Sequence, residues 1–114
     1  MIEPGRNIAI KVPLYKWEET VAFYRDRVGL TVIEEQGSSV AFEFGSMKLW
    51  IDRVNQQSQV DVWLELFSDE PDTAMVKLGG PKRDELEPLD GVLGHWTSDP
   101  AGTVLLVRQD HNSN

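Results

Sequence analysis

The amino-acid sequence predicts an α+β protein in which a unit of strand, helix and three strands occurs twice. Short runs of alternating apolar residues, bounded by turn residues, are typical of half-buried strands. Two further stretches have helical features, and each ends at glycine, which accepts a left-handed backbone. The 114 residues fit a single domain, with module one at about 5–54, module two at about 60–109 and a tail at 110–114.

The first module begins with a strand at residues 7–12, which Pro13 ends. Its apolar side chains Ile8, Ile10 and Val12 fall on one face. A helix is predicted at residues 17–28, because Trp17, Val21, Tyr24 and Val28 recur at helical spacing. Glu18 and Glu19 are placed in its first turn, where the helix dipole favours negative charge, and Gly29 ends it.

Three strands complete the first module, at residues 30–35, 40–44 and 47–54. The second module starts with a strand at 61–67 and a short helix that begins near Pro71 and ends at Gly79. Three more strands are predicted at residues 85–89, 92–97 and 103–109, the last two joined by a turn at 99–102.

Composition and charge restrict the class of protein. The formal net charge of −8 argues against nucleic-acid binding, which depends on basic patches. The chain has no cysteine, so it has no disulfides or thiolate chemistry. No apolar run approaches the length of about 20 residues that spans a bilayer. Residues 1–6 are polar and do not resemble a signal peptide, so we expect a cytoplasmic protein with no membrane partner.

The order of elements and three motifs resemble the vicinal-oxygen-chelate superfamily, which includes glyoxalase I, bleomycin-resistance proteins and extradiol dioxygenases. The motifs are the first strand at residues 7–12, the Phe-Tyr…Gly-Leu helix end at 22–30, and the final Asp-Pro-x-Gly hairpin at 94–106. The resemblance covers nearly the whole chain. It implies a curved, cup-shaped mixed sheet with helices on the outside, and a homodimer.

In metal enzymes of this superfamily, the first and last strands of each module hold a divalent ion. By position these ligand sites fall on Asn7, Asp52, Asp61 and Leu106. Leu106 cannot bind a metal, Asn7 is a weak neutral donor, and neither His95 nor His111 is at such a position. We therefore expect no metal and no cofactor. The alternative left open is a metal-dependent lyase, isomerase or dioxygenase with an atypical, all-oxygen ligand set.

Strand alternation places aromatic and charged side chains together on the inner face of the predicted cup. Tryptophan rings beside carboxylates suit an aromatic or cationic organic molecule, although Lys11 and Arg108 would pair with the acids or bind an anion. We therefore predict a small-molecule ligand and assign no catalytic residue. If the tryptophans instead fill a core or an interface, the protein is a structural or regulatory dimer without a ligand. The predicted ligand-binding residues are Asn7, Lys11, Trp50, Asp52, Asp61, Trp63, Glu65, Trp96 and Arg108.

Overall fold

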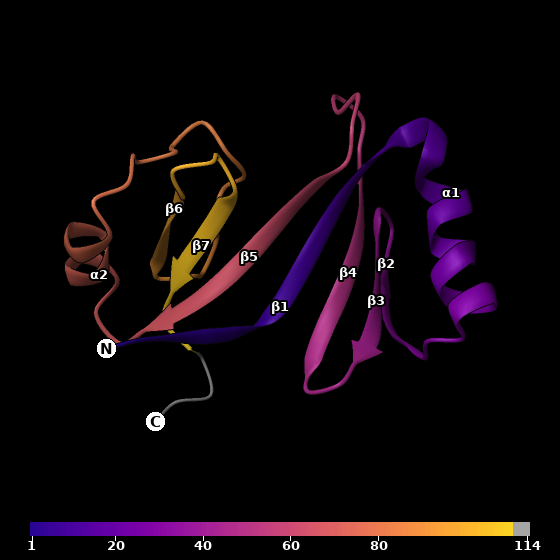
Figure 1. The fold of residues 1–114 in the computed structure, drawn as a ribbon, viewed down its shortest axis with the longest axis horizontal. Coiled ribbons are helices and arrows are strands. Elements are labelled where there is room, and N and C mark those ends of the chain that lie inside the picture. The colour runs from indigo at the N-terminus through magenta and orange to yellow at the C-terminus, as the bar shows by residue number, and fades with distance from the viewer. Residues whose placement is uncertain (111–114) are drawn as a thin grey trace. The chain divides into compact units, whose positions relative to one another are not determined.

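The computed structural model describes residues 1–110 and confirms the α+β class, with a mixed sheet that does not close into a barrel (Figure 1). The strands follow the order β2-β3-β4-β1-β5-β7-β6. The elements are β1 (Ile2–Pro13), α1 (Leu14–Ala22), the π-helical η1 (Phe23–Val28), β2 (Val32–Gln36), β3 (Ser39–Phe44), β4 (Met47–Val54), β5 (Asp61–Ser68), α2 (Pro71–Leu78), β6 (Gly94–Ser98) and β7 (Val104–Arg108).

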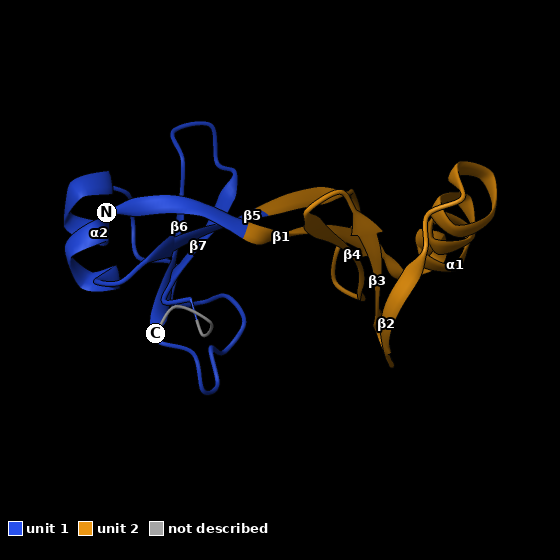
Figure 2. Cartoon of the chain, turned by 90° about the horizontal axis from the view of Figure 1, so that it is seen from below, with its two compact units in different colours: residues 1–5, 64–114 blue, residues 6–63 orange. Residues whose placement is uncertain are grey.

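The chain divides into two compact units, which Figure 2 shows in different colours. The N-terminal unit is Arg6–Trp63, and the C-terminal unit combines Met1–Gly5 with Leu64–Asn114. Strands β1 and β5 each contribute residues to both units. No helix among residues 1–110 is long and apolar enough to cross a membrane.

The N-terminal unit places its apolar core between α1 and one face of its sheet. Strand β1 runs parallel to β4, and β3 runs antiparallel to both β2 and β4. Trp17 of α1 donates a hydrogen bond from Nε1 to the carbonyl oxygen of Ile51, at 3.0 Å, and so joins the helix to β4. Ile8 and Ile10 of β1 pack against the same core as Leu49 and Ile51 of β4, so the alternation predicted along both strands is confirmed. The buried core residues are Val12, Val21, Val40, Phe42, Leu49 and Ile51.

The first helix begins earlier than the sequence predicted. Pro13 ends β1 and directly precedes α1, so the chain enters the helix at Leu14 without a loop. The first turn of α1 contains no acidic residue, and the placement of Glu18 and Glu19 there was wrong. The last part of the predicted helix is the π-helical η1, which ends at Gly29 in the left-handed conformation, with a φ of 85°.

The C-terminal unit contains two parallel strands, β5 and β7, with β6 antiparallel to β7. Helix α2 (Pro71–Leu78) is capped by Gly79 in the left-handed conformation, with a φ of 67°, as predicted. His95 of β6 lies 2.5 Å from Asp72 of α2, measured between Nε2 and Oδ1, and this contact links helix to sheet.

The prediction of a strand at residues 85–89 was wrong, because this segment forms turns and an irregular loop. Pro88 has no N–H to give to a strand ladder, and Gly91 has a left-handed backbone with a φ of 72°. A backbone bond of 3.0 Å from the Arg83 N–H to the Trp96 carbonyl ties the start of this region to β6. The second module therefore contains one strand, one helix and two strands.

Candidate functional site

The candidate site is the face of the N-terminal unit's sheet that points away from the apolar core. The register of β1 and β4 pairs Asn7 with Lys48, Ala9 with Trp50 and Lys11 with Asp52. Because side chains alternate along a strand, these three pairs share one face, as the sequence predicted. We call this surface the tryptophan face, and it comprises Asn7, Ala9, Lys11, Lys48, Trp50, Asp52 and the ring of Trp63, over which Lys11 lies.

Trp50 occupies the middle of the tryptophan face and is held by a side-chain contact. Its indole Nε1 donates a hydrogen bond of 2.7 Å to Asn7 Oδ1. Its register partners on the two neighbouring strands are Ala9 and Ala41, which are among the smallest side chains. The indole remains half-buried, and the Lys48 ammonium lies 5.9 Å from its ring centroid. Trp50 is therefore an anchored aromatic surface with small neighbours.

Lys11 lies between a carboxylate and an aromatic ring. Its Nζ is 2.7 Å from Asp52 Oδ2 and 4.1 Å from the centroid of the Trp63 ring. The side chains of Lys11 and Asp52 are 5% and 16% exposed, so the pair is largely removed from water. A buried ammonium is tolerated where an opposite charge and an aromatic face replace its hydration. Lys11 therefore already occupies a binding position on Trp63.

Asp61 forms hydrogen bonds with the two residues that follow it in the sequence. Its Oδ1 accepts a hydrogen bond of 3.0 Å from the N–H of Val62, and its Oδ2 accepts one of 3.1 Å from Trp63 Nε1. The carboxylate thereby fixes the orientation of the indole at the start of β5. Asp61 therefore positions Trp63.

The oxygen atoms that the resemblance assigned to a metal fit such an ion poorly. Asn7 Oδ1 accepts from Trp50, Asp52 is paired with a lysine ammonium, and Asp61 accepts two hydrogen bonds. The ammonium of Lys11 would repel a divalent cation held by Asp52. Within residues 1–110, no group of three histidine, cysteine, aspartate or glutamate side chains is arranged to hold a metal. We therefore derive no chemistry through a metal.

Three predicted ligand-binding residues belong to the C-terminal unit. Glu65 and Trp96 share a row with Leu106, because each is a register partner of that residue. Glu65 is 5% exposed in its side chain and lies 3.7 Å from Arg108 Nη1. Trp96 Nε1 donates a hydrogen bond of 2.7 Å to the carbonyl oxygen of Glu87 and so fastens the loop before β6. These contacts give Glu65, Trp96 and Arg108 structural partners inside their own unit.

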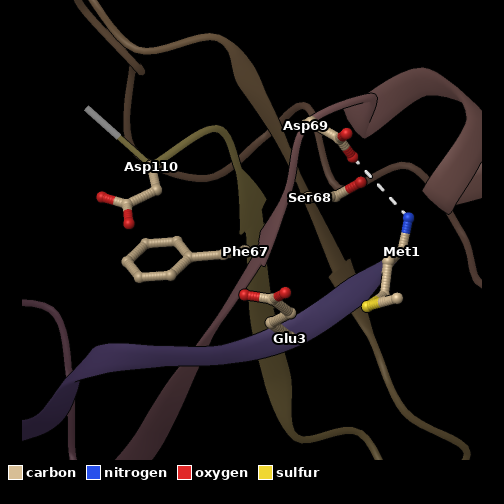
Figure 3. A pocket seen from close by; sticks show the side chains of 6 residues that line it. All are labelled: Met1, Glu3, Phe67, Ser68, Asp69 and Asp110. Atoms are coloured by element: carbon tan, nitrogen blue, oxygen red, sulfur yellow. Dashed lines mark ion pairs between the residues drawn. The ribbon is translucent and has the colours of Figure 1, made fainter. Parts of the chain in front are cut away.

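A hollow that the sequence did not predict lies in the C-terminal unit (Figure 3). It measures about 340 Å³, and the ring of Phe67 lies between the carboxylates of Glu3 and Asp110. Its residues come from the start of β1, the end of β5 and the segment after β7, so no local pattern could have identified it. Glu3 and Asp69 are exposed, and solvent weakens the field of such carboxylates. The lining residues are Met1, Glu3, Phe67, Ser68, Asp69 and Asp110.

Comparison with solved structures identifies the fold. A glyoxalase/bleomycin resistance protein/dioxygenase superfamily member from Vibrio splendidus matches with a TM-score of 0.57 at 12% identity, over 90% of this chain and 97% of that one. The Mn(II)-bound glyoxalase from Novosphingobium aromaticivorans matches with a TM-score of 0.65 at 19% identity, over 96% of this chain and 39% of that one. Methylmalonyl-CoA epimerase from Mycobacterium tuberculosis matches with a TM-score of 0.62 at 10% identity, over 95% of this chain and 86% of that one.

These likenesses confirm the predicted resemblance at the level of the fold, which is that of the vicinal-oxygen-chelate superfamily. No protein-family profile matches the chain, and no curated protein matches its sequence. Because one fold hosts many functions, the fold alone does not determine the activity of this chain.

Proposed function

We propose that the protein binds a small, flat organic molecule on the tryptophan face, with the Trp50 indole as the stacking surface and without metal chemistry. The observation that carries this proposal is the half-buried indole, held by Asn7 and flanked in register by Ala9 and Ala41. A fixed aromatic ring loses little conformational freedom when a second ring stacks on it. The fold supports the proposal, since solved proteins with this fold include one named as a glyoxalase and one named as an epimerase.

The charges around the two indoles favour a neutral or anionic ligand over a cationic one. Lys48 lies 5.9 Å from the Trp50 centroid, and Lys11 lies 4.1 Å from the Trp63 centroid. Each ring therefore has a lysine ammonium of the protein near it, and a ligand cation would meet like charge there. Lys48 also pairs with Glu34 at 3.4 Å, on the exposed surface, where its amine can turn towards a ligand anion. Of the aromatic or cationic ligands that the sequence predicted, we therefore propose an aromatic one.

The experiment compares three probes of one shape and different charge: naphthalene-2-sulfonate, 2-naphthol and N-methylquinolinium. Each is titrated into protein labelled with ¹⁵N, and the indole N–H resonance of Trp50 is followed. We expect saturable shifts with the sulfonate and the naphthol, and binding at least fivefold weaker for the cation. Trp50→Ala removes this indole, so binding to the variant is followed at the amide resonances of Ala9 and Ala41, the register neighbours of position 50. It should weaken naphthol binding by about tenfold, from the loss of one aromatic stacking partner worth up to about 1.5 kcal/mol beyond its area.

Phe44→Ala is the matched control, because Phe44 is an aromatic residue of the same unit that is 47% exposed and lies outside the tryptophan face. It should leave naphthol affinity unchanged. The proposal fails if no probe shifts the Trp50 indole resonance, or if the cation binds most tightly. Repeating the naphthol titration with Mg²⁺, Mn²⁺ or Zn²⁺ tests the metal-dependent alternative. An affinity that appears only with metal would favour that alternative.

A further inference from the structure

A second hollow lies in the C-terminal unit, between the end of α2 and the β6–β7 hairpin. Its volume is about 290 Å³, close to the lower end of the range of about 300–1,000 Å³ that is usual for ligand pockets. The side chains around it are mainly apolar, with Leu78 from the helix, Pro81 from the following loop, and Pro100 and Leu105 from the hairpin. The hollow therefore has the surface of a site for an apolar molecule.

One buried hydroxyl in the wall of this hollow has no hydrogen-bond partner. Thr97 is 1% exposed, and its Oγ1 is the one buried side-chain polar atom without a partner among those identified in residues 1–110. Thr97 pairs in register with Leu105, so both side chains lie on the same face of the hairpin. Buried hydroxyls in folded proteins almost always have partners, and an orphan one calls for an explanation.

Gly80 brings the main chain against this hydroxyl. A Cβ at Gly80 would lie 2.4 Å from Thr97 Oγ1 and 3.0 Å from the carbonyl oxygen of Ser98. The φ of Gly80 is not in the left-handed region, so the close approach is what excludes a side chain there. The loop after α2 thus packs against the Thr97 hydroxyl at the edge of the hollow, so an occupant that bonds this hydroxyl must displace Gly80.

The charged group nearest this hollow is already engaged. Asp99 contributes to the lining, and its Oδ1 accepts hydrogen bonds of 2.9 Å from the N–H groups of both Ala101 and Thr103. Those bonds hold the carboxylate within its own turn. Hydroxyl and apolar contacts are therefore what the hollow offers to a ligand.

We propose that this hollow binds a small, mainly apolar molecule with one carbonyl group, whose oxygen accepts a hydrogen bond from Thr97 Oγ1. The apolar part of the molecule contacts Leu78 and Leu105, while the carbonyl satisfies the orphan hydroxyl. This site lies in the C-terminal unit and is independent of the tryptophan face, which lies in the N-terminal unit.

The test uses cyclohexanone as the probe and the ¹⁵N-labelled chain. We expect saturable shifts of the Gly80, Thr97 and Ser98 amide resonances and no shift of the Trp50 indole resonance. Thr97→Val keeps the branched shape and removes the hydroxyl, so it should bind cyclohexanone about fivefold more weakly, as the loss of one hydrogen bond implies. Thr97→Ser retains the hydroxyl and should bind within about twofold of the unmodified protein, by the same reasoning.

Thr73→Val is the control, because Thr73 is exposed on α2 and does not line this hollow. It should leave the affinity unchanged. The proposal is overturned if the Gly80 and Ser98 resonances do not respond, or if Thr97→Val binds as tightly as the unmodified protein. It is also overturned if Thr97→Ser, although folded, loses binding as Thr97→Val does. A shift of the Trp50 indole resonance alone would mean that cyclohexanone binds at the tryptophan face, and it would also overturn the proposal for this hollow.

Discussion

Lys11 and Asp52 face each other on the parallel strands β1 and β4, with Nζ 2.7 Å from Oδ2. The two residues are 41 positions apart in the chain, and both side chains are more than four-fifths buried. Trp63 closes the other side of the ammonium, with its ring centroid at 4.1 Å. This arrangement places a compensated charge pair on the tryptophan face, where the sequence left open whether Lys11 pairs with an acid or binds an anion.

Removing the cation of this pair should destabilise the protein. Lys11→Met preserves much of the side-chain volume but leaves the Asp52 carboxylate without its partner. We expect the free energy of unfolding to fall by about 2–4 kcal/mol, the scale for breaking a largely buried ion pair. Urea unfolding followed by far-UV circular dichroism measures the change.

The control is Lys48→Met on the same face. Lys48 and Glu34 are 46% and 38% exposed and 3.4 Å apart, so their pair is worth about 0–1 kcal/mol. If Lys11→Met costs no more than Lys48→Met, the buried pair does not have the structural role described.

Asn7 should support Trp50 in both stability and binding. Asn7→Ala removes the acceptor of the 2.7 Å hydrogen bond from the indole. We expect a loss of about 1 kcal/mol in the free energy of unfolding, as for one side-chain hydrogen bond. Naphthol affinity should fall several-fold, because the ring is no longer held in place. Asn55→Ala, in the exposed loop after β4, is the comparison, and equal losses for both variants would refute the role of Asn7.

Local patterns were sufficient to predict most of the elements. The alternation in residues 47–54 and the turn residues beside it gave the bounds of β4 as the structure has them. Gly29 and Gly79 marked the ends of both helical segments, because a left-handed backbone is needed there. The same alternation correctly placed Asn7, Lys11 and Trp50 on one face.

Features that depend on distant contacts were not predictable. The apolar residues Val62 and Leu64 of β5 are 40% and 39% exposed, while Trp63 and Glu65 on the opposite face are 9% exposed. Helix α2 packs against β6 and β7. The sequence allowed Lys11 to pair with an acid, but it did not identify Asp52 as the partner, because the pair joins segments far apart in the sequence. Periodicity identifies a face and gives no information about what covers it.

The exposed apolar residues of β5 lead us to expect a homodimer. Leu64→Lys should shift the protein towards monomer, since a charge would have to be buried in an interface that covers this strand. Light scattering at micromolar concentration measures the mass. Val76→Lys is the control, because Val76 is 83% exposed on α2. A monomeric unmodified protein, or a dimer unaffected by Leu64→Lys, would contradict this prediction.

A methyl group at Gly5 should be poorly tolerated. A Cβ there would lie 2.5 Å from Cγ of Glu65, whose side chain is 5% exposed and has little room to move. We expect Gly5→Ala to cost about 1–3 kcal/mol of the free energy of unfolding, as overpacking does. Gly37→Ala provides the comparison in the urea experiment, because a Cβ at Gly37 meets nothing within 4 Å. Similar urea midpoints for the two variants would contradict this prediction, because they would show that the Glu65 side chain moves aside at little cost.

Asp99 should make the β6–β7 turn sensitive to acid. The N–H of Thr103 donates to its carboxylate, and with the N–H of Ala101 it lowers the pKa of Asp99 below the ordinary aspartate value. A carboxyl whose pKa is lower in the folded state stabilises the fold above its unfolded-state pKa. That stabilisation is lost as the pH falls through the lowered, folded-state pKa. The turn should therefore hold at neutral pH and loosen only in acid.

Carbon-13 NMR of the Asp99 carboxyl measures this titration directly, and the Thr103 amide resonance should move with the same midpoint. In Asp99→Asn the side chain cannot ionise, so the Thr103 amide should lose that pH dependence. The hollow beside Thr97 shares Asp99 in its lining, so cyclohexanone affinity should weaken over the same acid range. An Asp99 carboxyl that titrates at the ordinary aspartate value would show that its bonds to the Ala101 and Thr103 amides do not persist in solution.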